Sequence, residues 1–71
     1  MTYEIWGTVS RNLIAGFRTK AEALEAVREA LRRHGEGYVE TWLLAYEDEN
    51  EDSSTVAAGI ALLKLARSAA A

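Results

Sequence analysis

The chain has 71 residues, of which 49% are hydrophobic and 27% charged, with a formal net charge of -3 and neither Cys nor Pro. The lack of cysteine excludes disulfide scaffolds, thiolate metal sites and cysteine nucleophiles. The hydrophobic fraction is too high for a disordered chain, and no apolar run approaches the roughly 18 residues of a membrane span. These figures predict one small domain over residues 1–71.

The N-terminal part predicts a β-hairpin. Residues 3–9 alternate in the manner of a strand, with Ile5 on one face and Trp6 on the other. A short polar break follows, and residues 13–18 form a second apolar run. The two runs are close enough in the chain to pair as antiparallel strands.

The clearest local signal predicts a helix over residues 20–34. Thr19 and Glu22 have the spacing of a capping box, and Gly35 is suited to end the helix in a left-handed conformation. The apolar residues of this segment gather on one face, and Glu29 and Arg33 form a favourable i,i+4 pair on the other. The segment therefore reads as an amphipathic helix that covers one side of a sheet.

Residues 38–47 read as the longest strand, with apolar residues on both faces. A strand of this kind is covered on both sides. One helix cannot cover both faces of a small sheet, so part of this strand is expected to meet something else.

Residues 55–68 predict a second helix, with N-cap candidates in residues 53–55. Its apolar arc is too broad for a helix on the surface of a monomer. Gly59 costs about 1 kcal/mol relative to Ala inside a helix, which suggests that another backbone approaches it closely.

The resulting fold class is α+β, in the order β-β-α-β-α, with a small antiparallel sheet, an amphipathic helix on one face and a C-terminal helix. A domain this small without disulfide or metal commonly gains stability by oligomerisation, which predicts a homodimer. The expected interface consists of Trp6, Tyr38, Trp42, Leu44, Tyr46, Val56, Gly59, Ile60 and Leu63.

Charge is concentrated in the second half, where residues 36–71 hold seven of the 11 acidic residues but only two of the 8 basic ones. This asymmetry can orient two copies head to tail or attract a basic partner. The residues expected to face such a partner are Glu47, Asp48, Glu49, Glu51 and Asp52.

The same acidic segment resembles the start of a calcium-binding loop but fails the full pattern. Ser53 stands where the loop needs Gly, and Gly59 stands where it needs a bidentate Glu. His34 is the only histidine, so no histidine pair is present to hold a transition metal. We expect no metal and no cofactor.

No combination of residues indicates catalysis. The serines adjoin turns or caps, and the carboxylates cluster in a solvated segment without the fixed geometry that general acid–base catalysis needs. The chain is therefore expected not to be an enzyme. Single-stranded nucleic acid could stack on the rings of Trp6, Tyr38, Trp42 and Tyr46, although the net charge of -3 argues against it.

Two resemblances are visible. Tyr3-Glu4-Ile5-Trp6, Asn12-Leu13-Ile14, Phe17-Arg18-Thr19, Glu22-Ala23-Leu24 and Val27-Arg28 together resemble a group of small uncharacterised bacterial proteins, which brings no assigned activity. The strand–strand–helix order with Thr19 and Glu22-Ala23-Leu24 is also similar to the N-terminal region of HicB-type antitoxins. The chain is expected to lack the further strand and the Gly-Cys-like turn of that family, and no functional residue is carried over.

The expected function is a non-enzymatic protein–protein interaction module that self-associates through an aromatic sheet face and the C-terminal helix. The alternatives are an antitoxin-like regulator that neutralises a basic partner, and the binding of single-stranded nucleic acid. Residues 1–4 contain no basic region and no apolar targeting segment follows them, so a cytoplasmic location is expected.

Overall fold

The computed structural model describes residues 2–50 and 52–69. Four antiparallel strands form one sheet in the order β2-β1-β3-β4. In chain order the elements are β1 (Thr2–Gly7), β2 (Leu13–Phe17), α1 (Lys20–His34), α2 (Glu36–Val39), β3 (Trp42–Glu47), β4 (Ser53–Ala58) and α3 (Ile60–Ala69). The predicted α+β class and antiparallel sheet are confirmed.

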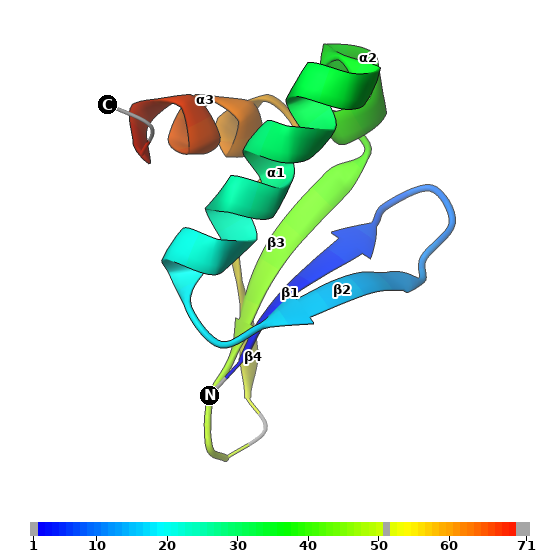
Figure 1. Ribbon diagram of the computed structural model, residues 1–71. Coiled ribbons are helices and arrows are strands. Elements are labelled where there is room, and N and C mark those ends of the chain that lie inside the picture. The colour runs from blue at the N-terminus through cyan, green and yellow to red at the C-terminus, as the bar shows by residue number, and fades with distance from the viewer. Residues whose placement is uncertain (1, 51, 70–71) are drawn as a thin grey trace.

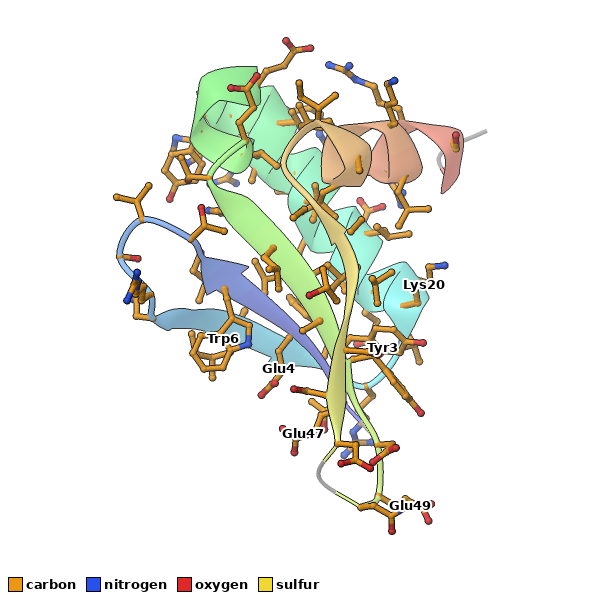
Figure 2. The ribbon with its side chains drawn as sticks, turned by 180° about the vertical axis from the view of Figure 1, so that it is seen from behind. Tyr3, Glu4, Trp6, Lys20, Glu47 and Glu49 are labelled. Carbon is orange, nitrogen blue, oxygen red and sulfur yellow. The ribbon has the colours of Figure 1, made fainter. Side chains whose placement is uncertain are left out.

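The helices lie on one side of the sheet, with α1 running roughly along the direction of β1 and β3 and α3 beside α1 (Figure 1). The core lies between these layers. Both the sheet and the helices contribute the largest fully buried side chains, which are Ile5, Val27, Val39, Leu44 and Leu62. The opposite side of the sheet carries no helix among the described residues (Figure 2).

Local signals place α1 as expected. The Thr19 hydroxyl accepts a hydrogen bond from the Glu22 backbone N–H at 3.1 Å. The Glu22 carboxylate accepts from the Thr19 hydroxyl at 3.2 Å, rather than from the Thr19 backbone as a full capping box would have it. Gly35 has a φ of 84° and ends the helix by donating its N–H to the Leu31 carbonyl.

The exposed face of α1 carries the expected ion pair, with Arg33 Nε 2.8 Å from Glu29 Oε1. The hydrogen bond from Arg33, reinforced by the charge of Arg32, lowers the pKa of the Glu29 carboxyl below its ordinary value. A depressed carboxyl pKa favours the folded state above the ordinary pKa, and this contribution is lost as the pH falls through the folded value.

Thr19→Ala is expected to lower the free energy of unfolding by about 1 kcal/mol, because it removes the acceptor for the Glu22 backbone N–H. Denaturant unfolding followed by circular dichroism measures this change. Thr19→Ser keeps the acceptor and is the matched control. An equal loss in both variants would contradict a capping role.

The turn after β1 begins earlier than expected. The first strand was predicted to reach residue 9 but ends at Gly7, and the second ends at Phe17 rather than residue 18. The Gly7 N–H donates to the Asn12 carbonyl, and the Arg11 N–H donates to the Gly7 carbonyl at 2.8 Å. These bonds close the loop between β1 and β2 directly after Gly7, so Val9 stands in the loop rather than in the sheet.

The predicted strand over residues 38–47 is correct only from Trp42 onward. Residues 36–39 form the short helix α2, continued by a bond from the Glu40 N–H to the Glu36 carbonyl at 2.9 Å. The apolar residues Tyr38 and Trp42 are four apart, a spacing that suits one face of a helical turn as well as one face of a strand. Over residues 38–41, the apolar pattern therefore fits a helical turn as well as a strand.

The predicted helix over residues 55–68 was wrong in its first part. Residues 53–58 form the edge strand β4, and the helix begins at Ile60. Gly59 separates the two elements with a φ of 57°, so it does not lie inside a helix. The observed order is β-β-α-α-β-β-α.

Candidate interaction surface

The helix-free side of the sheet carries an apolar row that crosses all four strands. Trp6 on β1 pairs with Leu13 on β2 and with Leu43 on β3, and Leu43 pairs with Ala58 on β4. Side chains of directly paired residues lie on the same face. We call Leu13, Trp6, Leu43 and Ala58 the apolar row.

The same face becomes polar and acidic away from the apolar row. Glu4 pairs with Ala45, and Glu47 pairs with both Thr2 and Ser53. Figure 2 shows Trp6, Glu4 and Glu47 along this face, with Glu49 in the β3–β4 loop beyond them. The face therefore has an apolar end beside the β1–β2 loop and an acidic end beside the β3–β4 loop.

Several residues predicted at the interface lie instead in the core of the chain. Leu44 is 0% exposed, Leu63 3% and Trp42 8%. Trp42, Leu44 and Tyr46 share the helix-covered face, because they pair with Gly7, Ile5 and Tyr3. The half-buried Tyr46 ring packs on the Tyr3 ring at 5.0 Å between centroids. The chain's own helices cover this face, so Leu44 and Leu63 cannot reach a partner of the folded domain, and only a small part of Trp42 remains exposed.

The other predicted interface residues remain accessible in different places. Trp6 lies half-buried in the apolar row, and Tyr38 is exposed on α2. Val56 and Ile60 are exposed near Gly59, which connects β4 to α3. The sequence analysis did not name Leu13, Leu43 or Ala58 as interface residues. The predicted hairpin could have indicated Leu13, and the second apolar face of the third strand could have indicated Leu43.

The four rings considered for nucleic-acid stacking do not form one platform. Trp6 lies on the helix-free face, whereas Trp42 and Tyr46 lie on the covered face. Continuous base stacking needs rings that are exposed side by side. This arrangement provides no such surface within the described residues.

The acidic segment is partly used to shape its own loop. The Asp48 carboxylate accepts hydrogen bonds from the backbone N–H groups of Asn50 and Asp52, at 2.9 and 3.1 Å. Glu49 and Asp52 are exposed, whereas Glu47 is half-buried on the helix-free face. Glu51 lies outside the described residues. The Asp48 carboxylate thus serves first to stabilise the β3–β4 loop, rather than to contact a partner.

Within residues 2–50 and 52–69, no three His, Asp or Glu side chains are grouped so that they could hold a metal ion. No helix in the described part of the chain has the length and hydropathy needed to cross a bilayer.

No family model matches the chain, and the searches of curated proteins and of solved structures find no match.

Proposed function

We propose that this chain is a non-enzymatic protein–protein interaction module that self-associates through the helix-free face of its sheet. The observation that carries the proposal is the apolar row, in which Trp6 stands between Leu13 and Leu43. Contiguous apolar surface on a small domain marks an interaction site, and tryptophan is enriched among the residues that dominate binding energy.

Charge favours one orientation of two copies. Stacking the two apolar rows with parallel strands brings the Glu4 positions of both copies together, which like-charge repulsion disfavours. Stacking them with the strands reversed places the β1–β2 loop of each copy, which carries Arg11, over the acidic end of the other. The proposed dimer is therefore a two-fold stack of sheets in which the strands of the two copies run antiparallel.

Trp6→Ala is expected to weaken this dimer by at least about tenfold, because the central ring of the contact is removed. Sedimentation equilibrium over the micromolar range measures the dissociation constant. Tyr38→Ala is the matched control, because this exposed ring lies on α2, away from the helix-free face. A wild-type chain that stays monomeric throughout this range would overturn the proposal.

The orientation has its own test by charge exchange. Arg11→Glu and Glu4→Arg are each expected to weaken the dimer, and the double variant to recover most of the loss, because opposite charges again face each other. Added salt should reduce the difference between the variants. Independent, additive effects would contradict the antiparallel arrangement while leaving the apolar contact in place.

A further inference from the structure

A hollow of about 410 Å³ lies at the end of the sheet, between the β1–β2 loop and α2. Its volume is within the range of small-molecule sites. Trp42 lines it, so it opens on the helix-covered side of the sheet and not on the face of Trp6. It therefore opens away from the apolar row, although both surfaces use the β1–β2 loop: Val9, Ser10 and Asn12 line the hollow, and Arg11 belongs to the proposed dimer contact.

Exposed apolar side chains gather around this hollow. Six large hydrophobic side chains are exposed within the described residues, and three of them line it: Val9 at 80%, Tyr38 at 48% and Ile14 at 41%. Single exposed hydrophobics are ordinary on a protein surface, but a group around one concavity marks a binding site.

The aromatic wall is held in place by neighbouring rings. The Tyr38 ring meets the Trp42 ring edge to face, with centroids 5.4 Å apart and planes at 63°. His34 packs on Tyr38 from α1 with centroids 4.4 Å apart. Because neighbouring rings hold Tyr38, a further ring can pack against it without a large loss of side-chain freedom.

The two walls of the hollow are tied together by hydrogen bonds. The Thr8 N–H and the Thr8 hydroxyl both donate to the Thr41 carbonyl, at 2.7 and 2.8 Å. The β1–β2 loop also packs closely over Gly7, where an added Cβ would lie 2.6 Å from the Ser10 Oγ. The hollow is therefore largely preformed rather than assembled by its ligand.

The lining selects for a neutral ligand with a polar group. No charged side chain lines the hollow among the described residues, and a charge buried there without a partner would be costly. The Ser10 hydroxyl donates to the Asn12 side-chain oxygen. The two N–H donors of the Asn12 amide are not used by this hydrogen bond. The Thr41 hydroxyl donates to the Tyr38 carbonyl and keeps its capacity to accept.

We infer that this hollow binds a small neutral aromatic molecule that carries a hydrogen-bonding group, of the phenol or indole class. The ring packs against Tyr38 and the edge of Trp42, between the apolar side chains of Val9 and Ile14. The polar group of the ligand meets Asn12 or Thr41. Apolar contact supplies the affinity, and these polar groups supply orientation.

The direct test is an amide NMR titration of the full chain with p-cresol and indole as neutral probes, and with tyramine and phenylacetate as charged ones. The expected result is saturable shifts in the β1–β2 loop and in α2 for the neutral probes, and binding of the charged probes weaker by about tenfold. Shifts that stay linear with concentration, or equal binding of all four probes, would overturn the inference.

Variants locate the binding. Tyr38→Ala is expected to weaken p-cresol binding by about tenfold, since it removes the ring against which the ligand packs. Val9→Gln is a second variant in the exposed loop, where a change cannot disturb the core, and should weaken binding severalfold. Trp6→Ala is the matched control and should leave p-cresol binding unchanged while it weakens self-association. Unchanged p-cresol binding in both site variants would show that the molecule binds elsewhere on the chain and would refute the assignment.

Discussion

Leu44→Ala is expected to lower the free energy of unfolding by about 2–5 kcal/mol, the range for deleting most of a buried leucine side chain. Leu44 is fully buried at the centre of the sheet, where it pairs with Ile5 and belongs to the cluster that includes Val27 and Leu62. For a domain of this size such a loss is a large part of the total stability.

The neighbouring Leu43→Ala is the control, because Leu43 points to the opposite face of the same strand. Chemical denaturation at several protein concentrations separates the two effects. The loss for Leu44→Ala should not depend on protein concentration, whereas Leu43→Ala should mainly weaken self-association. A concentration-dependent loss for Leu44→Ala would place this side chain at an interface instead of in the core.

Gly59→Ala is expected to cost about 1–2 kcal/mol, because an L side chain is strained at a φ of 57°. The turn at Gly59 is also well bonded. Its N–H donates to the Trp42 carbonyl at 3.1 Å, and its carbonyl accepts from the N–H groups of Leu62 and Leu63 at the start of α3. Any shift that relieves the strain therefore disturbs the junction between β4 and α3.

Gly37→Ala is the matched control for this change. Gly37 lies in α2, its φ is not positive, and an added Cβ meets no atom within 4 Å. This variant is expected to gain up to about 1 kcal/mol from helix propensity. Thermal unfolding should thus shift in opposite directions for the two alanine variants, and a neutral Gly59→Ala would show that the turn can adopt another conformation at little cost.

The segments predicted correctly are those whose signals are local. The Thr19 cap, the one-sided apolar face and the positive φ of Gly35 together define α1 without reference to the rest of the chain. Residues 38–41 lack such a decisive signal, because their apolar spacing fits a helical turn and a strand equally. Ser53, Ser54 and Thr55 are common at helix N-caps but also suit an exposed edge strand, and only pairing with β3 decides between these states.

The candidate surface required knowledge of the layers. The sequence pattern showed that the strand containing Trp42 and Leu43 has two apolar faces, but it did not indicate which face the helices cover. Placement of α1, α2 and α3 on a single side buries Trp42 and leaves Leu43 in the apolar row. Of the expected interface residues on the sheet, tertiary packing therefore leaves Trp6 on the open face and places Trp42, Leu44 and Tyr46 under the helices.

The outer position of β4 has a consequence for colloidal behaviour. A six-residue strand with neither charge nor proline stands at the margin of the sheet, where its outer backbone groups can template a strand from another molecule. The adjoining β3–β4 loop carries the densest negative charge of the chain. Electrostatic repulsion between such loops opposes continuous growth of the sheet, as flanking gatekeeper charges do in other proteins. We therefore expect the same acidic residues that give the domain its polarity to disfavour its assembly into fibres.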